Sequence, residues 1–358
     1  MKCTYRAAEL LKKNQKLKVH SVYRHTINIV VKDRILAFHR NIIPLTPLSL
    51  ALPFSEKEFD CFEMEAQRTG VVNLYVQHMA EPLHSISETQ RIKVTNFNET
   101  EIFSLESLKS SEFSDRCCWI QTGNFEKNAG KIILWEDRLD RRNKSDVFKP
   151  DWDKQNIADS ILPALLPILT QNYQLGGFSD CAVTSQKRKD DSFITQILRN
   201  KTAAILSENM SKDISEHVTE NLSKETGFER LIGSLIGLGP GLTPSGDDFL
   251  TGMLFAFVLQ ETIGAGSKTD MGKIEEKKKQ VCKVISENLK RTNDISKEYL
   301  FCAMENRFGE LYHMLQEQFF YGSVKKDLFC RIIHTGHSSG LDTLNGLAVG
   351  LKITEQEQ

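Results

Sequence analysis

The pattern of apolar and polar positions divides the chain into a strand-rich first part and a helix-rich second part. Residues 19–40 are rich in β-branched and aromatic side chains, and residues 32–34 (Lys-Asp-Arg) supply a turn, so this stretch predicts a β-hairpin. An amphipathic helix is predicted before it, over residues 4–16. Further strands are predicted at residues 70–79, 90–97, 117–123 and 130–138.

Helical periodicity dominates after residues 137–155, which are charged, contain Pro150 and are the best linker candidate. Helices are predicted at residues 191–210, 211–224, 247–262, 272–291, 295–317, 323–332 and 341–352. The expected fold is therefore α+β. A β-rich domain with a barrel or sandwich-like sheet covers residues 1–145, and a mainly α-helical domain covers residues 146–358.

The charge, the cysteine spacing and the apolar runs of the sequence limit the kinds of partner that we expect. The net charge of the 358 residues is −1, so no global field attracts nucleic acid. The eight cysteines are scattered without a CxxC pair, which favours reduced thiols and a cytoplasmic location. The first residues carry charges throughout, and no apolar run approaches the roughly 20 residues of a membrane helix. We expect no nucleic-acid or membrane partner.

The stretch GLGPGLTPSGDDFLTGMLFAF, residues 237–257, concentrates glycine, proline and hydroxyl groups before an apolar helix. Glycines let backbone N–H groups approach a ligand closely, prolines reduce the entropy lost on binding, and a helix N-terminus adds unpaired donors. Together they predict a preorganised site for a small anion such as a phosphate or carboxylate. Its candidate binding residues are Gly239, Gly241, Thr243, Ser245 and Gly246.

The same motif allows two other interpretations. A capping box formed by Ser245 and Asp248 explains both residues without a ligand, but it does not explain the glycines and prolines upstream. The spacing from Gly241 to Gly246 fits a nucleotide-binding GxxxxG loop, but Asp247 and Asp248 stand where lysine and a hydroxyl residue are needed.

The two aspartates are instead candidate catalytic residues. Asp247 and Asp248 could hold Mg²⁺ or accept hydrogen bonds from an amide NH₂ of a substrate, and no cofactor follows with certainty. A third hypothesis for the same motif is therefore that the protein is a Mg²⁺-dependent phosphotransferase.

A second loop, HTGHSSG at residues 334–340, leads into a related helix start. Residues 339–346 repeat the S-G-x-D-x-L-x-G pattern of residues 245–252. His337 is a candidate for polarising a carbonyl or moving a proton. The further candidates for substrate binding are Asn293, which could instead cap a helix, and Ser338, Ser339, Gly340 and Asp342.

The remaining polar motif lies in the β-rich part, in the stretch VHSVYRHTINI at residues 19–29. It contains His20, Ser21, His25 and Asn28. Taken alone, these residues are interpreted as polar residues of the surface or the core. No Ser-His-Asp order or nucleophile elbow can be read from their spacing.

Three stretches, GLGPGLTPSGDDFLTG, TNDISKEYLFCAMENRFGEL and GHSSGLDTLNG, resemble the bacterial family of the third subunit of oxamate carbamoyltransferase. The resemblance is strongest over residues 230–350 and includes the stretch at residues 19–29. It implies a cytoplasmic protein of purine (allantoin) catabolism that works with two other subunits. Carbamoyl phosphate and oxamate would be exchanged with oxalurate and phosphate.

The resulting hypothesis is a carbamoyltransferase-type subunit, an enzyme or part of one, that binds a small anionic substrate between the two loops. A hetero-oligomer with the other subunits is expected, with a homodimer as the alternative assembly. The competing hypothesis is a non-catalytic subunit that binds a metabolite or organises the other chains.

Overall fold

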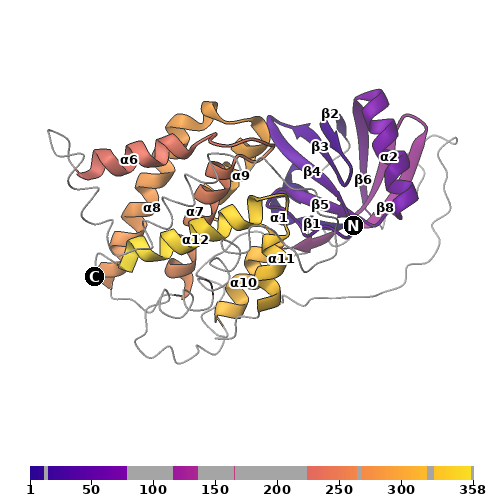
Figure 1. Cartoon of the computed structure of the whole chain (residues 1–358). Coiled ribbons are helices and arrows are strands. Elements are labelled where there is room, and N and C mark those ends of the chain that lie inside the picture. The colour runs from indigo at the N-terminus through magenta and orange to yellow at the C-terminus, as the bar shows by residue number, and fades with distance from the viewer. Residues whose placement is uncertain are drawn as a thin grey trace, which may run out of the picture. The chain divides into compact units, whose positions relative to one another are not determined.

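The computed structural model describes residues 1–11, 15–78, 116–135, 165, 224–263, 268–320 and 326–355. The chain divides into two compact units, Met1–Asp137 and Arg138–Gln358 (Figure 1). The first holds a curled sheet and the second is helical, so the predicted α+β class is confirmed. The strand predicted at 90–97, the helix predicted at 191–210 and all but the last residue of the helix predicted at 211–224 lie outside the described residues.

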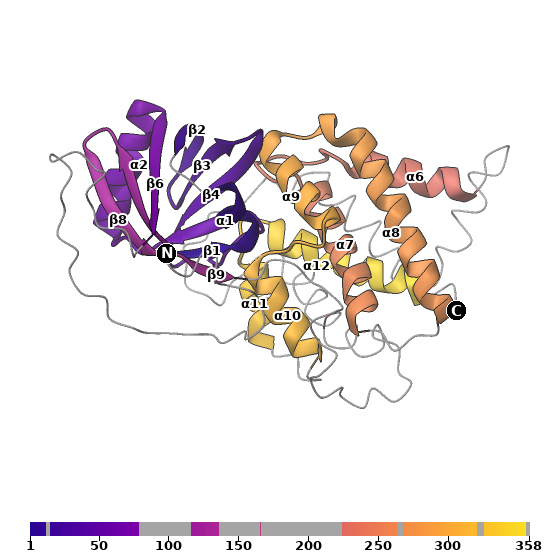
Figure 2. The same ribbon diagram turned by 180° about the vertical axis from the view of Figure 1, so that it is seen from behind.

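The described strands of the first unit form one sheet in the order β8-β7-β6-β2-β3-β4-β5-β1-β9. Figure 2 shows this sheet from the opposite side to Figure 1. The pairs β4–β5 and β1–β9 are parallel, and the other neighbours are antiparallel. The strands are β1 (Lys2–Thr4), β2 (Gln15–Tyr23), β3 (Thr26–Val31), β4 (Arg34–Arg40), β5 (Ser49–Leu52), β6 (Val71–His78), β7 (Arg116–Thr122), β8 (Phe125–Lys131) and β9 (Ile133–Trp135).

Of the hairpin predicted over residues 19–40, the part from Thr26 to Arg40 is confirmed as β3 and β4, joined by a tight turn at Lys32 and Asp33. Residues 19–23 instead belong to the separate strand β2. Both turn residues have positive φ, 49° and 64°, the backbone twist that a two-residue hairpin turn needs. The helix predicted over residues 4–16 is wrong at its C-terminal end. The helix α1 covers only Tyr5–Leu10, and β2 begins at Gln15.

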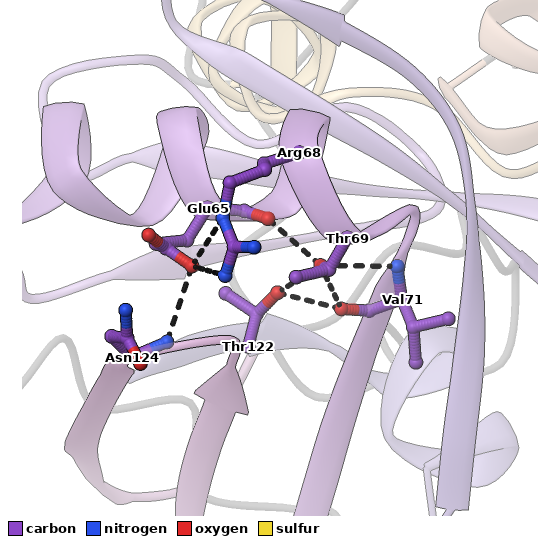
Figure 3. A network of polar contacts seen from close by, with 6 residues as sticks. All are labelled: Glu65, Arg68, Thr69, Val71, Thr122 and Asn124. Carbon is purple, nitrogen blue, oxygen red and sulfur yellow. Dashed lines mark hydrogen bonds and ion pairs between the residues drawn. The ribbon is translucent and has the colours of Figure 1, made fainter.

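Helix α2 (Glu56–Thr69) buries Phe59, Phe62 and Ala66 completely, and the Phe62 ring stacks on Phe38 of β4. Its C-terminal end is tied to the sheet by a network of polar contacts (Figure 3). The Thr69 and Thr122 hydroxyl oxygens are 2.8 Å apart, and Thr122 donates to the Val71 carbonyl at 2.6 Å.

A buried histidine, His39, is expected to make the first unit sensitive to acid. His39 on β4 is 3% exposed, and its ring nitrogens contact the hydroxyls of Thr26 and Thr46 at 3.0 and 3.2 Å. Burial lowers the pKa of His39 from 6.5 to about 4. The folded state therefore favours the neutral ring, while the unfolded chain takes up a proton near pH 6.5.

We therefore expect the stability of the protein to fall as the pH drops from 6.5 toward 4, by about 3 kcal/mol from this residue alone. Urea unfolding of the wild type, His39→Gln and His20→Gln across this range measures the effect. His39→Gln should flatten the pH dependence, whereas the exposed His20 serves as the matched control. An equally steep profile in His39→Gln would contradict this assignment.

The described helices of the second unit are α6 (Lys224–Leu235), α7 (Ser245–Ile263), α8 (Lys268–Asn288), α9 (Asp294–Met304), α10 (Glu310–Phe320), α11 (Lys326–Ile333) and α12 (Ser339–Glu355), with a 3₁₀ turn, η4, at Leu289–Arg291. The helix predicted at 295–317 is broken into α9 and α10, because Asn306 takes a positive φ of 62°. Within the described ranges, no helix is long and apolar enough to cross a membrane.

Helices α7 and α12 pack against each other through glycine. A Cβ atom on Gly252 would lie 1.9 Å from the Thr343 carbonyl oxygen, and one on Gly346 would lie 1.9 Å from the Phe249 carbonyl oxygen. These four residues hold matching positions in the two S-G-x-D-x-L-x-G segments, so each helix contacts the other in the same way. The sequence repeat therefore corresponds to a reciprocal helix contact.

Candidate functional site

The two glycine- and hydroxyl-rich loops meet where α7 and α12 begin. The hydroxyl oxygens of Thr243, before α7, and Ser339, the first residue of α12, are 2.8 Å apart. Each helix start is also packed closely against the preceding helix. A Cβ on Gly246 would lie 1.9 Å from the Leu235 carbonyl oxygen, and one on Gly340 would lie 1.7 Å from that of Ile332. Glycine is required at both positions because no side chain fits.

Asp247 holds the first loop in place. It is 1% exposed, and its Oδ1 accepts from the Gly237 amide at 2.9 Å. Its Oδ2 accepts from the hydroxyls of Thr292 and Ser296 at 2.5 and 2.6 Å. The carboxylate thus joins the start of the loop, the first turn of α7 and the start of α9. With both oxygens engaged, Asp247 is suited to positioning the loop.

Asp248 lies in a different environment. Its Oδ2 atom is buried and has no hydrogen-bond partner among the described residues. Burial raises the pKa of Asp248 well above 3.8, and the charge of Asp342 raises it further, while the hydroxyls of Ser339 and Thr243 partly offset the effect. Asp342, 4% exposed, is the matching aspartate of the second segment. Two carboxyl groups of the repeat therefore lie near each other at the paired helix starts.

Tyr312 of α10 belongs to the same cluster, although no sequence pattern singled it out. Burial raises the pKa of Tyr312 above its usual value of 10, the Thr343 hydroxyl opposes that rise, and the charge of Asp248 adds to it. The Thr343 hydroxyl in turn donates to the Ser339 carbonyl at 2.7 Å. The phenol therefore stays protonated beside the two helix starts and can donate a hydrogen bond.

Both loops retain backbone donors. Gly241 has a φ of 103°, is exposed, and would place a Cβ with no atom within 4 Å, so its surroundings are open. No other residue in the described part of the chain accepts a hydrogen bond from the amides of Gly239, Gly241, Leu242, Gly336, His337 or Ser338. Unpaired amides beside two helix N-termini form an electropositive surface suited to an anion.

The other sequence-predicted residues lie as follows. Ser245 is the first residue of α7 and 3% exposed, and it packs beneath Gly239. Asn293 caps α9, because its Oδ1 accepts from the Ser296 amide at 3.0 Å. Ser338 is half-buried beside Ser339, and its carbonyl accepts from the Asp342 amide at 2.9 Å. His337 is exposed on the second loop.

Asp247 and Asp248 are the residues that the sequence offers for holding Mg²⁺. Over the described ranges, no group of three or more His, Cys, Asp or Glu side chains is placed to hold a metal ion. Asp247 already accepts three hydrogen bonds from the protein. Its oxygens are therefore committed to the loop and to α9.

Comparison with known proteins bears on this region of the chain. Residues 235–351 match the family described as oxamate carbamoyltransferase subunit AllH. The matched segment spans both loops and α7 to α12, so it contains all three motifs that carried the resemblance. It covers about a third of the chain and leaves the first unit outside the AllH match. No curated protein and no solved structure matched the chain.

Proposed function

We propose that this chain is a subunit of a carbamoyltransferase-type enzyme and binds a small anionic substrate at the paired loops 237–248 and 334–342. The substrate class includes carbamoyl phosphate, oxamate and oxalurate. The contact between Thr243 and Ser339 carries this proposal, because it brings two sets of unpaired amides to one place. The AllH match supports the reaction class and an assembly with other carbamoyltransferase subunits.

Carbamoyl transfer from carbamoyl phosphate fits these residues chemically. The acceptor nitrogen attacks the carbonyl carbon and loses a proton, the bond from that carbon to the phosphate oxygen breaks, and phosphate leaves with the bonding electrons and takes up the proton. Amides of Gly239, Gly241 and Ser338 would hold the anionic groups, which places the reactants and stabilises the charge that develops on the phosphate. His337 would contact the substrate from the exposed side of the second loop.

Asp248 would act as a neutral donor in this site. A carboxyl group whose pKa is raised keeps its proton into a higher pH range, so it can donate to an anionic oxygen. The ionisable groups that face it are Asp247, Asp342 and Tyr312. None of them supplies a positive charge, so anion binding must weaken when Asp248 ionises.

Binding of oxamate and of inorganic phosphate, measured by calorimetry across pH, tests the site. We expect affinity to fall as the pH rises through the pKa of Asp248. Asp248→Asn keeps an NH₂ donor and should lose this pH dependence, whereas Asp248→Ala should weaken binding about tenfold or more. Asp294→Asn, at the exposed start of α9, is the matched control.

The outcomes separate the competing functions. Unchanged anion affinity in Asp248→Ala would contradict a two-loop site. Normal binding combined with full carbamoyl transfer by an assembled complex that contains Asp248→Ala and His337→Ala would instead support a non-catalytic, organising subunit.

A further inference from the structure

A second group of polar residues, independent of the paired loops, lies on β2 and β3. Consecutive residues of a regular strand point to opposite faces of the sheet. The β2–β3 register shifts between Val19 and Ser21, which marks a bulge. Next to this irregularity, the His20 Nδ1 and Ser21 Oγ atoms are 3.0 Å apart. Bulges are common beside active sites, because they redirect side chains in this way.

Asn28 fixes the orientation of the Ser21 hydroxyl. It lies opposite Ser21 in the β2–β3 register, is 6% exposed, and donates from Nδ2 to Ser21 Oγ at 3.0 Å. Because Oγ accepts this hydrogen bond, the hydroxyl proton is free to point at His20 Nδ1. A neutral imidazole protonated at Nε2 can accept that proton. The hydroxyl therefore lies between a donor and a base.

The group is also accessible within the described structure. His20 is exposed and Ser21 is half-buried. Strand β6 pairs with β2 only from Gln15 to Lys18, so among the described strands only β3 pairs with the segment from Ser21 to Tyr23. The exposed imidazole and the half-buried hydroxyl are the groups that a small reactant would meet.

We infer that Ser21 is a nucleophile, with His20 as its general base, toward small activated esters or carbamoyl compounds. In this step Ser21 Oγ forms a bond to the carbonyl carbon and passes its proton to His20 Nδ1. The bond from that carbon to the leaving oxygen breaks, and the leaving group departs with the electron pair and takes up the proton that the His20 imidazolium returns. Water, deprotonated by the same imidazole, then releases the acyl group and restores the hydroxyl.

Acylation by p-nitrophenyl acetate tests this assignment on the full-length protein. Intact-mass and peptide mass spectrometry would follow acetylation at each serine over time. We expect Ser21 to be acetylated at least 100-fold faster than Ser55, an exposed serine of the same unit whose hydroxyl contacts the Glu58 amide and no imidazole. Ser21→Ala should abolish the fast reaction.

His20→Gln gives the decisive comparison, because this exposed residue can change without disturbing the core. Acetylation of Ser21 in this variant should fall to the rate at Ser55, and added imidazole should restore part of it. Circular dichroism confirms that the variant folds. Acetylation of Ser21 at the Ser55 rate in the wild type, or an unchanged rate in His20→Gln, would overturn the inference. Neither result bears on anion binding by the paired loops.

Discussion

Replacing Gly346 by alanine should destabilise the helical unit by about 3 kcal/mol, because the new methyl group would lie 1.9 Å from the Phe249 carbonyl oxygen. Neither neighbour can move easily. The obstructing atom belongs to the backbone of α7, whose residues Gly252 to Gln260 are buried, so the two helices would have to separate and lose contacts along their whole interface.

Urea unfolding measures this cost, with Gly272→Ala as the matched control. Gly272 is exposed within α8, and a Cβ there would meet no atom within 4 Å. Alanine at that position should stabilise the protein by about 0.5–1 kcal/mol, since glycine is the poorer helix former. Equal stabilities of Gly346→Ala and Gly272→Ala would mean that the helix contact is not as close as described.

Asp247→Ala should cost about 3–5 kcal/mol, a loss of similar size with a different cause. The substitution leaves three donors without an acceptor: the Gly237 amide and the buried hydroxyls of Thr292 and Ser296. Each buried donor without a partner costs about 1–3 kcal/mol. The first loop would also lose its attachment to α9, so anion affinity should fall together with stability.

Differential scanning calorimetry and anion titration on Asp247→Ala, Asp247→Asn and Asp294→Ala separate these contributions. Asp247→Asn keeps an oxygen acceptor and should lie between the wild type and Asp247→Ala. Asp294 is exposed and pairs with Lys297, so its removal should cost no more than about 1 kcal/mol. A stability of Asp247→Ala close to that of Asp294→Ala would argue against the anchoring role of Asp247.

The spacing of apolar residues predicted those helices and strands whose buried faces match their sequence pattern. The helices beginning near residues 247 and 341 were correct, because apolar spacing favoured them. The hairpin predicted over 19–40 was correct for β3 and β4, but residues 19–23 form the separate strand β2, and the turn between β2 and β3 was missed. Helix α2 was missed inside a strand-rich region, although Ser55 and Glu58 form a full capping box that could have revealed it. The break at Asn306 could not be predicted, because a positive φ at asparagine depends on tertiary contacts.

The candidate site was likewise predictable from the sequence only in part. The repeat placed Asp248 and Asp342 at matching helix starts, and both loops were identified from their glycines and hydroxyls. The different environments of Asp247 and Asp248 could not be read from two adjacent aspartates, because they follow from which helix faces each side chain. Tyr312 lies outside both loops and directly follows the stretch at residues 292–311, but no pattern of residues there marks it as part of the site. The pairing of His20 with Ser21 depends on a register shift that strand periodicity does not reveal.

Because the glycine contact is reciprocal, the same helix contact occurs twice within one chain. The surroundings of Gly252 on one helix are reproduced at Gly346 on the other, so a substitution measured at one position forecasts the result at its counterpart. If the stabilities of the two glycine variants differ, the difference reports on residues that the two segments do not share. One such residue is Asp247, whose counterpart in the second segment is Leu341. Specialisation of the two halves can thus be measured within one polypeptide, without a related protein for comparison.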